Sequence, residues 1–331
     1  MLNLFQILQC KYLYIFREKI FTPPHNYGII SFIVIKSSYI IFLQRVNTVI
    51  SLKNGDGIQW PDGKRIAVML TFDFDAELLR YSVIGKRKIG FADVSRGQYG
   101  PKEGLKRCLA MLQRHQLPAT FFIPGEIIEK YPEQCREIAA GKYEIAFHGY
   151  AHDNTIGLSK EQEIASLEKS EKLIQGLSGR KPVGARGPLD ALQDDSLDLF
   201  AQRGYLYDST LKDCDWPYVL ENGLVELPTD VAMDDFSYFY FSYADEAPIN
   251  CSYLPDDVYA MWQDAFDELA AEGDKIMVIK LHPQLIGRVS RIAMLERFIL
   301  YMQQRGAWIA DCQTVAQYVK ESYKAKESEA K

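Results

Sequence analysis

The sequence has little of what nucleic-acid binders, zinc ribbons and disulfide-rich proteins need. Its 331 residues include 38 Lys and Arg and 44 Asp and Glu. The chain therefore lacks the surplus of basic residues that is typical of nucleic-acid binders. The six cysteines form no CxxC pair, which argues against a zinc ribbon and against a dense disulfide framework. Such scattered cysteines are typical of a reducing compartment.

Long apolar runs are also scarce. The stretch "GIISFIVIKSSYIIFL" is interrupted by Lys36 and is shorter than the ~20 apolar residues of a membrane-spanning helix. The first fifty residues contain no Asp, and they suggest three alternatives: a weak membrane anchor, an ordinary extension, or a start codon placed too far upstream. We therefore divide the chain into an N-terminal extension over 1–50, one barrel domain over 51–320 and a polar tail over 321–331.

Beyond the extension, strand and helix patterns alternate. Apolar runs predict strands at 65–75, 118–124, 143–149, 183–188, 205–210, 224–230, 275–283 and 307–312. Helical spacing predicts helices at 100–116, 126–141, 159–179, 194–204, 255–273, 290–306 and 314–327, the third opening with a Ser159–Gln162 capping box. The alternation predicts an α/β fold with a parallel sheet, and both a closed barrel and an open doubly wound sheet fit it.

Polar residues at the strand ends favour the barrel. Asp73, His148, Arg186, Asp208 and His282 each end a predicted strand or follow it directly. In a (β/α) barrel those ends converge on one face, where active sites form. We therefore predict an irregular (β/α) barrel of seven or eight units, with these side chains gathered at one end.

The segments "TFDFDAE" and "HGYAHDN" suggest a metal site. In an extended strand Asp73 and Asp75 point to one side and Phe74 to the other, and two neighbouring acids need a positive charge beside them. His148 and His152, four residues apart, would share one face if the segment turned helically. With Asp75 as a third ligand they would leave open positions on a divalent cation, as in catalytic sites.

Three further segments carry polar or aromatic groups whose roles stay open. Arg186 in "GARGP" either holds a carboxylate or lies on the surface, and His282 in "IKLHP" is either a general acid or a structural histidine. The stretch "FSYFYFSY" at 236–243 fits sugar stacking, a subunit surface or core packing.

Taken in order, "TFDFDAE", "HGYAHDN", "RGP", "YDSTLKDCDW" and "IKLHP" resemble the motifs of the polysaccharide deacetylases, the NodB-homology family of carbohydrate esterases, over roughly residues 64–315. The resemblance implies an irregular (β/α) barrel. It also implies hydrolysis of a non-peptide C–N bond, usually the N-acetyl amide of an amino sugar, with one divalent metal, most often zinc. Asp75, His148 and His152 would be the metal ligands.

The resemblance also implies the acid–base roles. Asp73 would be the general base that takes a proton from the attacking water, and Arg186 would orient it. His282 would protonate the departing amine, supported by Asp208 and Asp215.

Two departures from the usual motifs widen the range of substrates. Phe74 separates the two aspartates, and Pro283 follows His282. These variants resemble the branch of peptidoglycan-deacetylase-like and allantoinase-like proteins, which implies an N-acetylated glycan or a small cyclic amide or imide as substrate. A non-catalytic carbohydrate-binding member is a further alternative. The branch also implies a cytoplasmic homo-oligomer, with anchoring through the N-terminal segment as the alternative localisation.

Overall fold

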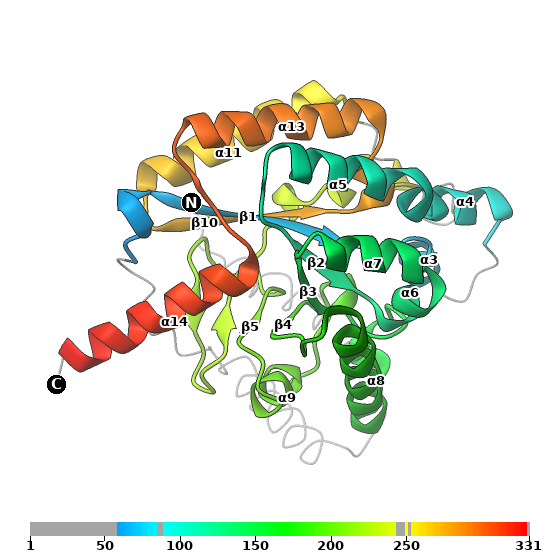
Figure 1. Ribbon diagram of the computed structural model, residues 1–331, viewed down its shortest axis with the longest axis horizontal. Coiled ribbons are helices and arrows are strands. Elements are labelled where there is room, and N and C mark those ends of the chain that lie inside the picture. The colour runs from blue at the N-terminus through cyan, green and yellow to red at the C-terminus, as the bar shows by residue number, and fades with distance from the viewer. Residues whose placement is uncertain (1–57, 85–88, 243–248, 251–252, 330–331) are drawn as a thin grey trace, which may run out of the picture. The chain divides into compact units, whose positions relative to one another are not determined.

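The computed structural model describes residues 58–84, 89–242, 249–250 and 253–329 (Figure 1). The predicted extension over 1–50, with its candidate anchor, lies outside them. Among the helices of the described ranges, none combines the length and apolar character that a membrane crossing requires.

One sheet organises these residues. Its strands lie in the order β10–β1–β2–β3–β4–β5–β7–β6, with β11 also paired to β1, and all neighbours are parallel except β6 and β7. The strands are β1 (Ile66–Asp73), β2 (Thr120–Ile123), β3 (Glu144–Phe147), β4 (Gly184–Ala185), β5 (Tyr207–Asp208), β6 (Tyr218–Val219), β7 (Val225–Glu226), β10 (Lys275–Leu281) and β11 (Trp308–Ile309). A separate ribbon pairs β8 (Phe241–Ser242) with β9 (Ile249–Asn250).

The sheet curls until the chain after β7 meets β10. Asp234 forms a parallel bridge with Lys280, and the Asp235 N–H donates to the Lys280 carbonyl at 3.0 Å. Near the start of β10, the Ile276 N–H donates to the Asp215 carbonyl at 3.0 Å. These contacts close the sheet into an irregular barrel, and the predicted fold class is confirmed.

Helices follow most strands and cover the sheet, with α5, α11 and α13 lying over β1 and β10 (Figure 1). The helices are α3 (Leu78–Ile84), α4 (Phe91–Tyr99), α5 (Leu105–Arg114), α6 (Gly125–Lys130), α7 (Pro132–Ala140), α8 (Lys160–Ser178), α9 (Ser196–Gln202), α10 (Phe236–Phe239), α11 (Pro255–Glu272), α12 (Pro283–Ile286), α13 (Val289–Gln304) and α14 (Cys312–Glu329). The capping box at Ser159 is confirmed.

Two predicted helices differ in detail. The helix expected over 126–141 is divided into α6 and α7 at Pro132, because proline has no N–H to continue the hydrogen-bond ladder. The helix expected over 100–116 begins with a π turn at Gly100–Gly104 before α5.

The alternation of side chains along β1 separates two apolar clusters. Val68, Leu70 and Phe72 pack in the cluster shared with the covering helices, whereas Ala67 and Met69 belong to the cluster inside the curl of the sheet. Because strand side chains alternate, Thr71, Asp73 and Asp75 continue the inner row. On β10 the inner residues are Ile276 and Val278. By the same alternation, Lys280 and His282 continue their row on the inner face.

Candidate active site

The end of β1 places two carboxyl groups on the inner face of the sheet. Asp73 and Asp75 are both buried, and Phe74 between them packs in the outer cluster. Asp73 Oδ2 and Asp75 Oδ1 lie 3.9 and 3.4 Å from the same His148 Nε2, so both side chains point to one side, as the spacing predicts. The chain then turns at Ala76, which has a φ of 50°.

The two histidines meet through a loop and not through a helix. Gly149 and His152 have φ values of 70° and 56°, so the expected helical turn is wrong. These left-handed residues fold the loop back on itself, because a left-handed backbone reverses the chain where a helix would carry it forward. The two imidazole centroids come to lie 5.0 Å apart.

Hydrogen bonds orient both imidazoles. His148 Nδ1 donates to the Arg186 carbonyl at 2.8 Å. His152 Nδ1 lies 2.9 Å from Ser82 Oγ, whose own proton is directed to the carbonyls of Leu78 and His152. Each ring therefore carries its proton on Nδ1 and turns the lone pair of Nε2 inward, the arrangement that metal-binding histidines need.

The geometry at Asp75 fits a cation. Its Oδ1 lies 3.4 Å from His148 Nε2 and its Oδ2 lies 3.7 Å from His152 Nε2. Both oxygens are buried without a hydrogen-bond partner, and burial raises the pKa of Asp75 to about 8. Burial also lowers the pKa of His148 to about 4, so its ring is neutral. Two lone pairs and a carboxylate facing one point are a donor set for a divalent cation.

Arg186 holds the second carboxylate. Its guanidinium is fully buried, and Nη1 donates to Asp73 Oδ1 at 2.7 Å and to Thr71 Oγ1 at 3.0 Å. Burial raises the pKa of Asp73, but the positive charges around it, with Arg186 the largest, together outweigh burial and keep the pKa well below its usual range. Asp73 is therefore ionised, and its other oxygen, Oδ2, is buried without a hydrogen-bond partner.

His282 follows β10 and faces the same centre. Its Nε2 lies 3.6 Å from Asp75 Oδ2, and its Nδ1 lies 2.6 Å from Asp235 Oδ1. The other oxygen of Asp235 accepts from the His282 backbone N–H at 3.0 Å. Burial lowers the pKa of His282, but the carboxylates around it, with Asp235 the largest, together outweigh burial and raise the pKa to about 10, so the ring is protonated at neutral pH.

The contacts of Asp208 and Asp215 differ from the expectation that they support His282. The Asp208 carboxyl accepts from Thr210 and pairs with Glu226 on the neighbouring strand. Asp215 lies in the loop before β6, where its carbonyl accepts from Ile276. Among the described residues, the acid that contacts His282 is Asp235, which reaches it because the segment after β7 pairs with β10.

Sequence reasoning therefore missed Asp234, Asp235 and Lys280. Lys280 is buried and forms ion pairs with Asp190 at 2.8 Å and with Asp234 at 3.1 Å. One local signal was available, because Lys280 stands two residues before His282 in an apolar strand and so shares its face. Asp235 lies 47 residues from His282, and no local pattern joins them.

These side chains surround a cavity of about 140 Å³. Its wall includes Asp73, His148, His152 and His282, and Lys280 and Phe236 complete one side. The arrangement combines an ionised carboxylate, a cation-binding set and an imidazolium around one small space. It can remove a proton on one side of a bound group and donate one on the other.

Comparisons with known proteins agree with this chemistry. A family model described as polysaccharide deacetylase matches residues 97–207. A peptidoglycan deacetylase of Helicobacter pylori is 29% identical over 241 residues, covering 64% of this chain and 82% of the relative. The Puue allantoinase has the same fold, with a TM-score of 0.69 and 24% identity over 81% of this chain and 95% of that one.

The strongest of these similarities is to a solved structure. A protein assigned as a polysaccharide deacetylase from Mycobacterium smegmatis superposes with a TM-score of 0.77 and 33% identity, over 82% of this chain and 96% of that one. This chain therefore belongs to the polysaccharide deacetylase family, whose enzymes are hydrolases of carbon–nitrogen bonds other than peptide bonds.

Proposed function

We propose that the protein is a divalent-metal-dependent N-deacetylase that removes acetyl groups from a peptidoglycan-type glycan. One observation carries the proposal: three buried carboxylate oxygens of Asp73 and Asp75 have no hydrogen-bond partner and face the imidazoles of His148 and His152. Buried charged oxygens are costly unless a cation or a proton satisfies them.

Asp75, His148 and His152 would hold the cation, and zinc suits a set of two imidazoles and one carboxylate. When bound, such a cation supplies Lewis acidity, which activates water and polarises an amide carbonyl. The second acidic group, Asp234 with Asp235 beside His282, is less suited to a cation, because Lys280 and His282 already neutralise it.

Asp73 is proposed as the general base. Arg186 occupies Oδ1 and keeps the carboxylate ionised, which leaves Oδ2 to accept a proton from the attacking water. The Arg186 side chain is itself fixed by Ser209, whose carbonyl accepts from Nε at 3.0 Å and whose hydroxyl accepts from Nη2 at 3.1 Å. The base therefore has a single orientation before substrate arrives.

His282 is proposed as the general acid. Because the ring is protonated at neutral pH and its Nδ1 proton is held by Asp235, the second proton lies on Nε2, which faces the cavity. Protonation of the amide nitrogen at this position releases the amine and breaks the C–N bond.

A second candidate function is ring opening of a small cyclic amide or imide. It is favoured by the shared fold of the allantoinase and by the small volume of the catalytic cavity, about 140 Å³. Homo-oligomer formation and the choice of zinc stay predictions from the resemblance.

The test is turnover of the metal-reconstituted protein on N-acetylated chitooligosaccharides, peptidoglycan fragments, allantoin and cyclic imides. We expect amine release from a glycan, abolished by Asp73→Asn and by chelation and restored by added metal. Turnover only of allantoin or imides would replace the first function with the second. Glycan binding without turnover of any substrate would indicate a non-catalytic member.

A further inference from the structure

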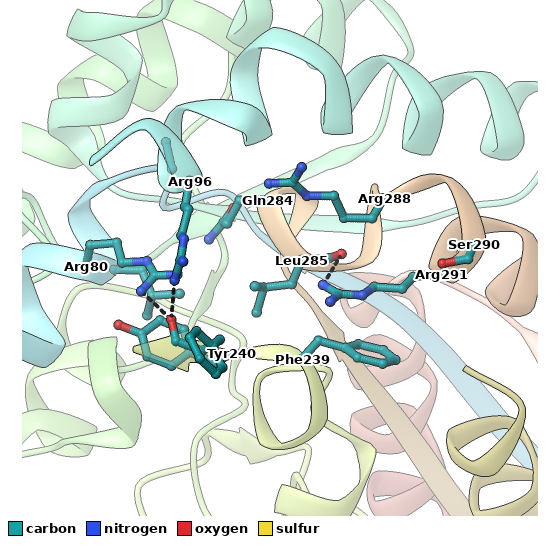
Figure 2. A pocket seen from close by; sticks show the side chains of 12 residues that line it. Arg80, Arg96, Phe239, Tyr240, Gln284, Leu285, Arg288, Ser290 and Arg291 are labelled. Carbon is teal, nitrogen blue, oxygen red and sulfur yellow. Dashed lines mark hydrogen bonds between the residues drawn. The ribbon is translucent and has the colours of Figure 1, made fainter. Parts of the chain in front are cut away.

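Next to the catalytic cavity lies a larger one, of about 440 Å³, lined by four arginines. Figure 2 shows Arg80 and Arg96 on one side and Arg288 and Arg291 on the other, with Gln284 between them. Leu79 lines both cavities, and Gln284 lies in α12, two residues after His282. The two spaces are therefore neighbours.

The described lining of the larger cavity is cationic. Asp93 lies 3.8 Å from Arg80 and 3.6 Å from Arg96, and both guanidinium groups also donate to the Phe241 carbonyl. No acid is present among the described residues that line the cavity. The described lining thus brings four guanidinium groups and no carboxylate to the cavity wall, and such a cationic lining favours binding of an anion.

Arg288 and Arg291 are the clearest source of positive charge in this cavity. Within the described part of the chain, neither has a carboxylate at ion-pair distance. Their contacts are with aromatic rings, Arg288 over Tyr99 at 3.5 Å and Arg291 over Phe239 at 4.3 Å, and with the Leu285 carbonyl at 3.1 Å from Arg291 Nη1. Burial and the neighbouring guanidinium charges lower the pKa of both.

Gln284 is a second and independent sign of a ligand. Its side chain is only 4% exposed and lines the cavity, yet neither its amide oxygen nor its amide nitrogen has a hydrogen-bond partner. A buried amide in this state is costly, and a polar ligand in the cavity would satisfy it. The donor of Gln284 and the guanidinium groups together suit an oxyanion.

We propose that this cavity is a subsite for a carboxylate carried by the substrate, so that the enzyme prefers acidic N-acylated substrates over neutral ones. The inference rests on the proposed hydrolase function and adds the substrate class to it. Guanidinium groups bind carboxylates through paired hydrogen bonds, and the volume accepts a substituent much larger than an acetyl group. Its place beside His282 would hold such a substituent while the amide lies at the catalytic centre.

The first experiment measures anion binding without turnover. Calorimetric titration with sulfate at constant ionic strength should show binding to the wild-type protein. Arg291→Gln and Arg288→Gln should each weaken it at least about tenfold, since charge-assisted hydrogen bonds are lost. Arg297→Gln is the matched control, because Arg297 lies on the same helix but is exposed and paired with Asp256. Equal binding by all variants would overturn the proposal.

The second experiment separates a substrate carboxylate from a free anion. A carboxylate-bearing N-acetylated glycan fragment is compared with its neutral methyl ester in kcat/KM. We expect at least about a tenfold preference for the acid, lost in Arg291→Gln mainly through KM and kept in Arg297→Gln. Sulfate binding without this preference would indicate a site for a free anion and would overturn the assignment to substrate.

A further outcome separates the subsite from the proposed function. If no amide is hydrolysed, the hydrolase function fails, and the subsite is then judged by direct binding. Arginine-dependent binding of the acidic fragment, with none of its ester, would still support a carboxylate subsite.

Discussion

Replacing Asp235 with Asn tests whether this residue makes His282 an acid. The carboxylate contacts His282 twice, at 2.6 Å to Nδ1 and at 3.0 Å to the backbone N–H. It is the largest influence that raises the pKa of His282 from 6.5 to about 10, while burial acts in the opposite direction. Asn preserves the size and one acceptor but removes the charge, so the pKa of His282 should fall below 7.

The size of the effect follows from the protonated fraction. At pH 8, a histidine with a pKa of 10 is ~99% protonated, and one with a pKa of 6 is ~1% protonated, so the rate should fall ~10²-fold. Below about pH 6 the variant should recover much of this loss, because its imidazole is again protonated. Asp234, 3.7 Å from Nδ1, keeps part of the attraction, so the loss should not exceed that of His282→Ala.

The assay is the dependence of kcat and kcat/KM on pH, with metal content and melting temperature measured on the same samples. Asp215→Asn is the control. Asp215 is exposed, and its substitution removes the same negative charge at a position away from His282. An unchanged alkaline limb in Asp235→Asn would refute the reasoning. So would an equal effect of Asp215→Asn, which would restore the role that the sequence motif suggests for that residue.

Four further predictions concern the metal, the base, stability and the extension. His148→Ala should abolish binding of about one divalent cation per chain in elemental analysis, and wild type that stays metal-free after reconstitution would contradict the site. Asp73→Asn should lose ~10²–10⁴-fold in rate with its metal retained, whereas Asp75→Asn should also lose metal; the reverse pattern would exchange their roles. Burial raises the pKa of Glu226 well above its ordinary 4.5, so the folded state keeps a proton that the unfolded chain releases. The free energy of unfolding therefore falls as the pH rises from the unfolded-state pKa towards the folded-state pKa. The melting temperature of Glu226→Gln should therefore fall less than that of wild type between about pH 6 and about pH 9. Parallel plots of melting temperature against pH for the two proteins would contradict this. A chain starting near Val49 should fold by circular dichroism, which an insoluble product would disprove.

Local sequence patterns were sufficient for the chemistry that lies on single elements. The apolar run of β1 ends in Asp73 and Asp75, and strand alternation puts both on one face in any fold that contains the strand. The same argument places His282 at the end of β10. The pairing of His148 with His152 was expected for the wrong local reason, since the loop uses left-handed residues where a helical turn was predicted.

Only the tertiary structure decided which side chains meet across elements. Arg186 reaches Asp73 because β1 and β4 face each other inside the curl, and Asp235 reaches His282 because the chain after β7 closes the sheet against β10. The arginine cavity likewise joins residues from α3, α4 and α13. Sequence periodicity reports which face of its own element a side chain occupies. The distance between two faces depends on how far the sheet curls, which many strands and their packing determine together.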